Sequence, residues 1–310
     1  MKALALAIAV AALSIVALAG TAHAEPVTVG VFAPTAPFPS TSARVELAQR
    51  LGDSLGKSTG GTGTGKVYLR ASDFAAAVRK GDITIALVDA TYLAATGGNY
   101  TVLAAAVRGG DTTHTWQLVA KGNLKVTDLR GKRVLVPAVG GREPDFIYNV
   151  MLGGEVGRDF FAKLEAAPDT SSALAALNLG KAEAAIVPAG VELAPGTQTV
   201  LTLPSISGPV LVAFGAMPAE RRAALAQAAG AFKGDTTITG FRASDGEAVK
   251  AISRRFTVAA KRGPLAIPAV RLLVGDLVEG RMFAIERTLS ASFATSPVKT
   301  SPASTSDGHH

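Results

Sequence analysis

Two segments, one in each half of the chain, follow the same plan: a strand, a polar helix cap, a helix, a glycine that ends it and a returning strand. In the first segment we expect strands at 67–71 and 83–90 around a helix at 72–80 that ends at Gly81. In the second we expect strands at 161–167 and 184–189 around a helix at 169–179 that ends at Gly180. Units of this kind build sheets covered by helices, so the chain is predicted to be α/β. An internal duplication and the common pattern of unrelated units explain the likeness equally well.

Two earlier strands of these halves, at 27–33 and 133–137, each run into a turn rich in Pro, Gly or Ser before the next helix. We expect the chain to cross between the halves near Thr115 and to return near Gly215. Paired crossings form a hinge. Ligands of open α/β sheets bind beyond the carboxyl ends of the strands, and pockets favour domain interfaces. The sequence therefore predicts a two-lobed binding protein with a hinge and an interlobe cleft.

The amino-terminal segment has the pattern of a secretory signal. Lys2 precedes an apolar run at 3–19, and the small residues Ala22 and Ala24 flank His23 in an A-x-A pattern. We expect cleavage before Glu25 and a periplasmic protein with no membrane insertion. The chain contains no cysteine, so it offers neither a disulfide nor a cysteine for lipid attachment.

The expected domain boundaries follow from these segments. Residues 1–24 form the signal peptide, and residues 25–114 together with 217–290 form a discontinuous first lobe. Residues 115–216 form the second lobe with the hinge strands, and the tail at 291–310, rich in Ser, Thr and Pro, is expected to be disordered. An apolar helix at 268–289 is expected to pack on the first lobe.

The charge pattern argues against a nucleic-acid binder. The formal net charge of +7 falls to +6 once the signal is removed, because Lys2 is its only charged side chain. The basic residues are scattered and aromatic residues make up 5% of the chain, whereas nucleic-acid binders cluster both.

Motifs for catalysis and cofactors are weak. Residues 60–66 share the glycine and lysine spacing of a P-loop, but Val67 stands where Ser or Thr must bind magnesium, so we interpret 56–66 as an exposed loop. The Gly-x-Ser-x-Gly motif of hydrolases is absent, and His114 is the only histidine outside the signal and the tail. We therefore expect no enzyme, no catalytic residue, no metal and no cofactor.

Candidate ligand contacts lie at the ends of strands, where helices begin with free N–H groups. Thr41 or Ser42 can cap the first helix, Asp89 can cap another, and the glycines can serve only the turn, so each residue also has a purely structural interpretation. The candidates are Thr35, Ser40, Thr41, Ser42, Asp89, Thr91, Tyr92, Val139, Gly140, Gly141, Arg142 and Pro188.

Several segments together resemble the type II periplasmic solute-binding proteins, specifically the phosphate/phosphonate-binding group that serves ATP-binding-cassette (ABC) importers. The resemblance covers about residues 27–256 and rests on 29–35, 85–93, 128–137, 173–188, 209–217 and Gly240, Phe241 and Arg242. It implies a two-lobed type II fold, a phosphate- or phosphonate-like anion in the cleft and an ABC permease as partner. The family commonly has serines in the turn after the second lobe's first strand. This chain has Ala138, Val139, Gly140 and Gly141 there, so a larger and less polar ligand is the other possibility.

Three functions remain open at this point. The first is a monomeric binding protein that closes on a small-molecule ligand and presents it to an importer. The second is a module that senses its ligand for a receptor or kinase ectodomain, and the third is an exported hydrolase built on His114.

Overall fold

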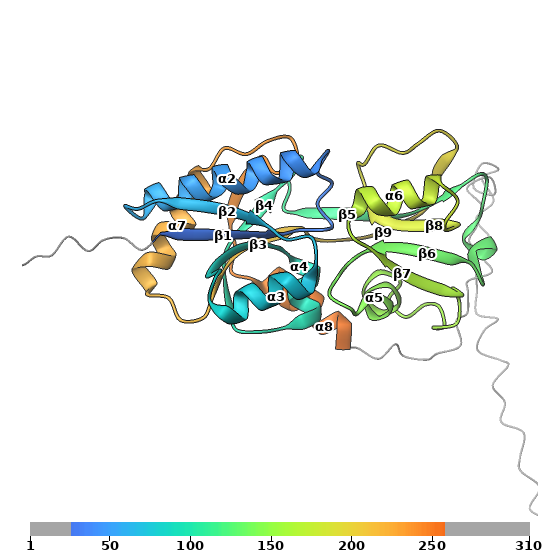
Figure 1. The fold of residues 1–310 in the computed structure, drawn as a ribbon. Helices are drawn as coiled ribbons and strands as arrows, with labels where there is room; N and C mark the ends of the chain where they lie inside the picture. Colours follow the sequence, from blue (N-terminus) through green and yellow to red (C-terminus); the bar gives the residue numbers. More distant parts are fainter. Residues whose placement is uncertain (1–25, 258–310) are drawn as a thin grey trace, which may run out of the picture. The chain divides into compact units, whose positions relative to one another are not determined.

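The computed structural model describes residues 26–257 and contains two β-sheets (Figure 1). The six-stranded sheet has the order β11-β4-β10-β3-β1-β2, and the five-stranded sheet has the order β7-β6-β8-β5-β9. We refer to the parts built on them as the first and second lobes. The expected signal peptide, the helix at 268–289 and the tail lie outside the described residues. No helix within 26–257 combines the length and the apolar character needed to cross a membrane.

The first sheet is covered by helices on both faces. Its strands are β1 (Val27–Phe32), β2 (Gly63–Val67), β3 (Ile85–Asp89), β4 (Tyr100–Val107), β10 (Pro209–Phe214) and β11 (Gly240–Ala243). Alternate residues of a strand point to opposite faces. Leu87 accordingly lies in one core with α2 (Thr41–Ser58) and α7 (Ala219–Ala231). Val88 lies in the other core with α3 (Ala71–Lys80), α4 (Ala90–Thr96) and α8 (Glu247–Thr257).

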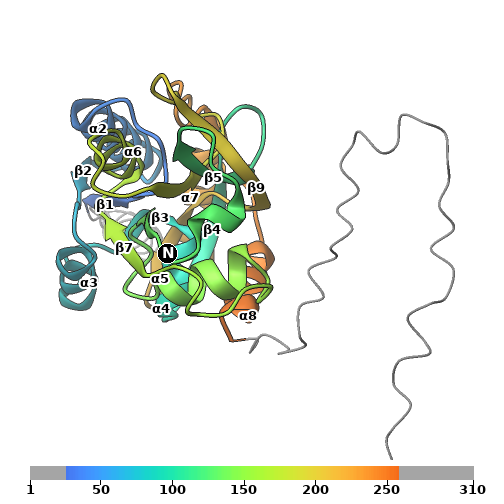
Figure 2. The ribbon, with the colours of Figure 1, turned by 90° about the vertical axis from the view of Figure 1, so that its right-hand side faces the viewer.

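The second sheet is built in the same way. Its strands are β5 (Thr113–Lys121), β6 (Arg133–Pro137), β7 (Lys163–Ala167), β8 (Ala184–Pro188) and β9 (Thr197–Ser207), with the 3-10 turn η1 (Val126–Leu129) before β6. Helix α6 (Thr170–Asn178) covers one face through Ala173 and Leu177. On the other face, α5 (Glu143–Asp145) and the π-helical turn η2 (Phe146–Met151) place Phe146 against Trp116. Figures 1 and 2 show α2 and α6 on one side of the sheets and α4, α5 and α8 on the other.

Two adjacent segments connect the sheets. The outward crossing runs from β4 to β5 through the Arg108–Asp111 bridge, close to the predicted position. The return crossing lies at Gly208 rather than near Gly215, because β10 already pairs with β3 and β4 of the first sheet. Gly208 N donates a hydrogen bond of 2.9 Å to Thr112 O, so the two crossings are tied to each other.

The prediction of a strand at 67–71 and a loop at 56–66 is wrong. Helix α2 continues to Ser58, and the glycine-rich stretch forms the edge strand β2. The reason is close packing. A Cβ atom at Gly63 would lie 1.8 Å from Gly52 O, and one at Gly65 would lie 2.0 Å from Ala48 O. Glycine is therefore required there so that β2 can lie directly against α2.

Candidate functional site

The two lobes meet at the amino terminus of α6, which lies against the first lobe. Asp169 accepts a hydrogen bond of 2.8 Å from Ser172 N, as a helix cap does, and its other carboxylate oxygen lies 3.1 Å from Arg44 Nη2 of α2. Thr170 N donates to Pro34 O (3.0 Å) and Thr170 Oγ1 donates to Thr35 O (3.1 Å). The loop after β1 therefore holds the second lobe by direct contacts, and Thr170 is buried.

The Asp169 cap was expected from the sequence, but its ion pair was not. Burial raises the pKa of Asp169, but the hydrogen bonds from Ser172 and Arg44 outweigh burial and lower that pKa. The carboxylate is thus held in its charged form at the amino terminus of α6, where a negative charge is favourable, and beside the Arg44 guanidinium.

Asp89 ends β3 next to this contact. Its Oδ2 accepts a hydrogen bond of 2.7 Å from Thr35 N. Asp89 occupies the N-cap position of α4, as the sequence suggested, but its side chain makes no capping hydrogen bond there. Oδ1 of Asp89 and Oγ1 of Thr91 are buried and have no hydrogen-bond partner among the described residues. Burial raises the pKa of Asp89 to about 7, although the Thr35 hydrogen bond and the Arg44 charge act to lower it.

The turn after β6 is closed by a carboxylate of the same chain. Glu143 Oε1 accepts hydrogen bonds from Val139 N (3.0 Å) and Gly141 N (3.1 Å). Val139, Gly140 and Gly141 of this turn were candidate ligand contacts. In the structure Glu143, which is buried, bonds the N–H groups of two of them.

Gly140 in the same turn contacts the first lobe. Its φ angle is +97°, and a Cβ atom would lie 3.0 Å from the Tyr92 ring and 3.0 Å from the Thr96 methyl group of α4. The ring of Tyr92 packs edge-on against Phe32, with 4.9 Å between the ring centroids. Gly140 and Tyr92 therefore form a contact between the lobes.

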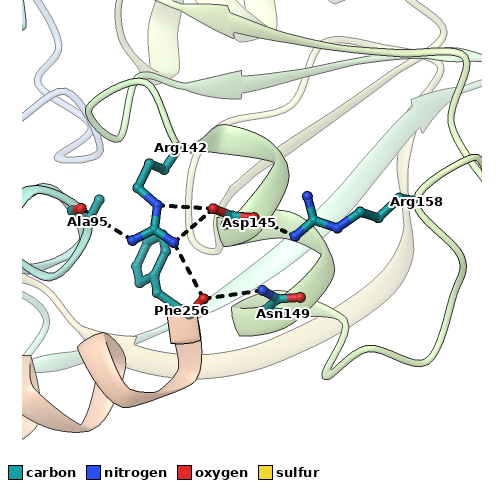
Figure 3. A network of polar contacts seen from close by, with 6 residues as sticks. All are labelled: Ala95, Arg142, Asp145, Asn149, Arg158 and Phe256. Carbon is teal, nitrogen blue, oxygen red and sulfur yellow. Dashed lines mark hydrogen bonds and ion pairs between the residues drawn. The ribbon is translucent and has the colours of Figure 1, made fainter. Parts of the chain in front are cut away.

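Arg142 is clamped by an acidic neighbour (Figure 3). Its Nε and Nη2 lie 3.0 Å and 2.8 Å from Asp145 Oδ2, and Asp145 Oδ1 lies 2.5 Å from Arg158 Nη2. Burial raises the pKa of Asp145, but the hydrogen bonds from Arg158 and Arg142 outweigh it and lower the pKa.

The same guanidinium reaches the carbonyl ends of two helices in the first lobe (Figure 3). Arg142 donates to Ala95 O of α4 and Phe256 O of α8, both at 3.5 Å, and lies over the Phe256 ring at 5.0 Å. Asn149 donates to the same Phe256 carbonyl at 3.3 Å. A cation at a helix carboxyl terminus is favourable, so Arg142 joins the two lobes.

A cavity and a groove remain between the lobes beside the crossings. The cavity has a volume of about 20 Å³, room for about one water molecule, and its walls include Thr35, Trp116, Pro188 and Ser207. The adjoining groove has a volume of about 900 Å³. Further groove residues come from both lobes and include Phe38, Thr170, Ser171, Leu174, Glu192 and Thr236.

Arg108 and His114 line both spaces. Arg108 Nη2 donates a 2.9 Å hydrogen bond to Ala189 O in the second lobe. Burial and the nearby Arg108 charge lower the pKa of His114 to about 4, so the imidazole is neutral at pH 7. A Cβ atom at Gly208 would lie 2.7 Å from His114 Nε2, which places His114 against the return crossing.

The predicted candidates are thus only partly brought together. Thr35 and Pro188 line the cavity, and Asp89 bonds Thr35 beside it. Ser40 caps α2 through Ala43 N, a role that we expected of Thr41 or Ser42, and all three side chains are exposed outside the cavity and the groove. Arg44, Arg108 and Glu143 were missed. Of these three, only Arg44 could have been noticed in the sequence, because it is a cation in the first turn of a helix and that turn has no acidic residue.

No family model and no curated protein sequence matches the chain. Solved structures do match it. XAC2383 from Xanthomonas citri bound to ATP has 13% identity and a TM-score of 0.59, over 74% of this chain and 96% of that one. PhnD1 from Prochlorococcus marinus in complex with methylphosphonate has 14% identity and a TM-score of 0.57, over the same shares.

A binding protein component of an ABC phosphonate transporter from Pseudomonas aeruginosa has 14% identity and a TM-score of 0.58, over 76% of this chain and 89% of that one. The chain has the fold of a two-lobed periplasmic binding protein. This periplasmic-binding-protein fold confirms the predicted α/β class and the two lobes. The resemblance to the phosphonate-binding group is confirmed at the level of the fold.

Proposed function

We propose that this protein is an exported binding protein that takes a small anionic solute into the interlobe cleft at Arg108 and presents it to an ABC importer. One observation carries the proposal: Arg108 lies in the outward crossing between the lobes, bonds Ala189 of the second lobe and lines both the cavity and the groove. A solute at this position contacts both lobes, which is what couples binding to closure of a hinge.

The chemistry of the cleft favours an anionic group at Arg108. A guanidinium carries five N–H donors, and the guanidinium of Arg108 donates to Ala189 O through Nη2. The remaining donors suit a carboxylate, phosphonate or phosphate group. The neutral imidazole of His114 offers one donor and one acceptor beside it.

The size of the groove favours a solute larger than inorganic phosphate. Its volume of about 900 Å³ lies within the range typical of sites for organic ligands. Phe38 and Leu174 supply apolar walls. Asp111 and Glu192 also line the groove, and their carboxylates disfavour a ligand that is negatively charged along its whole length. The two similar proteins in complex with methylphosphonate and with ATP bind phosphorus-containing anions, in keeping with an anionic group at one end of the solute.

The proposal contains no covalent step. His114 lies at the return crossing, and its low pKa makes the imidazole a weak base. We therefore assign it a role in binding and in the hinge.

The first experiment is native mass spectrometry of the protein isolated from its own host, followed by release and identification of the bound molecule. Titration calorimetry with that molecule, methylphosphonate and ATP then tests the site. Arg108→Ala is expected to weaken binding at least tenfold, since a charge-assisted pair contributes about 1.5–3 kcal/mol. Arg70→Ala removes an exposed arginine paired within α3 of the first lobe and should leave affinity unchanged. Equal affinity of wild type and Arg108→Ala would contradict this site.

A further inference from the structure

Arg44 lies where its positive charge is unfavourable unless a carboxylate lies beside it. It lies in the first turn of α2, where the helix dipole is positive, and that turn has no acidic residue. The side chain is buried and stacks on Phe38, 5.1 Å from the ring centroid. A buried cation needs an ionic partner, and in the structure that partner is Asp169 of the second lobe at 3.1 Å. We call this arrangement, in which the two lobes touch, closed.

In the closed arrangement two buried polar atoms of the first lobe lack a hydrogen-bond partner. Arg44 Nε and Asp89 Oδ1 are both buried without a hydrogen-bond partner among residues 26–257. The two groups belong to the same lobe, and the Arg44 charge lies close enough to Asp89 to act on its pKa. The first lobe therefore holds an unpaired guanidinium N–H and an unpaired carboxyl oxygen while Arg44 bonds the other lobe.

We propose that Arg44 exchanges carboxylates as the lobes move, pairing with Asp169 when the cleft is closed and with Asp89 when it is open. The inference rests on the hinge motion of the proposed function and adds its regulation. Exchange keeps the buried cation paired in both states, so opening does not leave Arg44 uncompensated. It also gives the two unpaired atoms of the closed lobes a partner in the open ones.

The exchange makes closure depend on pH. In the closed lobes burial raises the pKa of Asp89 to about 7. In the open lobes that pKa is lower, because the guanidinium bonds the carboxylate and water reaches it. Closure therefore takes up a proton; it is favoured below about pH 7 and is lost as the pH rises through 7.

The neighbouring Asp169 and His114 have pKa values below this range. Thr35 contributes a backbone N–H, Arg44 of α2 contributes a guanidinium, and Asp169 of α6 has a lowered pKa. His114 at the cleft has a pKa of about 4.

The test measures the distance between the lobes without any solute. The chain has no cysteine, so nitroxide labels at Lys57→Cys in the first lobe and Thr127→Cys in the second, both exposed, report on the lobes alone. For the wild type the closed-to-open ratio should fall about tenfold from pH 6 to pH 8, because one proton is taken up at a pKa of about 7.

Matched variants test whether Asp89 causes the pH dependence of closure. Asp89→Asn should keep the closed-to-open ratio the same at both pH values, while Asp53→Asn, the same change at an exposed position of α2, should behave as the wild type. Asp169→Asn should open the lobes at pH 6, and far-ultraviolet circular dichroism confirms that each variant is folded.

The proposal is overturned by an unchanged distance between pH 6 and pH 8 in the wild type, or by a pH response that persists in Asp89→Asn. Neither result depends on finding a solute. The absence of any bound or binding solute would instead defeat the proposed function, so the two failures are distinguishable.

Discussion

Glu143 Oε1 lies 3.0 Å from the backbone nitrogen of Val139, so the turn after β6 holds a carboxylate of its own chain. The same oxygen also accepts from Gly141 N. The Glu143 carboxylate thus bonds N–H groups that an anionic solute could otherwise bind. We therefore expect the solute at Arg108 rather than at this turn.

Removal of the Glu143 carboxylate should expose an anion site in the turn. Glu143→Ala leaves two N–H groups without their partner and should cost about 1–3 kcal/mol of unfolding free energy. Inorganic phosphate should restore part of that loss, because oriented N–H groups bind anions. Thermal unfolding with phosphate, at ionic strength matched by sodium chloride, measures the effect. Glu143→Gln keeps an acceptor oxygen and is the control; equal stabilisation of wild type and Glu143→Ala by phosphate would contradict the prediction.

Alanine substitutions at Gly140 and Gly141 should separate the strain of a positive φ angle from the effect of the contact between Gly140 and α4. Gly140→Ala and Gly141→Ala both place alanine at a positive φ angle, +97° and +85°. Only the first brings a Cβ atom within 3.0 Å of Tyr92 and Thr96, whereas nothing lies within 4 Å at Gly141. We expect Gly140→Ala to cost about 1–3 kcal/mol more than Gly141→Ala in urea unfolding, the usual range for overpacking. Similar losses of unfolding free energy in the two variants would contradict this prediction and show that the Tyr92 ring can move aside at little cost in stability.

Packing of β2 on α2 should depend on the absence of a side chain at Gly63. A Cβ atom there would lie 1.8 Å from Gly52 O, so Gly63→Ala must displace the strand from the helix. We expect a loss of at least about 2 kcal/mol, measured by thermal unfolding. Gly230→Ala in α7 meets nothing within 4 Å and should be neutral or stabilising, since alanine favours helices. A Gly63→Ala protein as stable as the wild type would contradict this account.

Asp89 should destabilise the fold at high pH. Its pKa is raised from 3.8 to about 7 in the folded chain, so folding binds a proton and stability falls as the pH rises through 7. The shift corresponds to an upper limit on the order of 4 kcal/mol. Asp89→Asn should therefore be more stable than the wild type at pH 8 and similar to it below pH 4, as measured by urea unfolding across this range. The same pH dependence of stability in the wild type and in Asp89→Asn between pH 4 and pH 8 would contradict a raised pKa.

Much of the fold follows from local patterns. Strand β6 has the bounds that its β-branched run predicts, and α6 begins after the predicted cap Asp169. Glycine stops at Gly81 and Gly180 adopt positive φ angles, as helix ends require. Such features depend on residues a few positions apart, which is why a single sequence predicts them.

Local sequence patterns could not predict the position of strand β2. Residues 56–66 have the composition of a loop, yet α2 runs to Ser58 and Gly63–Val67 form an edge strand, because the glycines of α2 and β2 face each other. Local propensity favoured a turn, and packing between two elements overrode it.

The sequence by itself determined the α/β class, the two lobes and the family whose fold they share, because periodic burial and turn residues act over short distances. Only the tertiary structure decided the site. Arg44 and Asp169 lie 125 positions apart, and Arg108 and Ala189 lie 81 positions apart. A buried charge takes whichever partner the fold brings within reach, and that choice depends on the three-dimensional arrangement of the lobes.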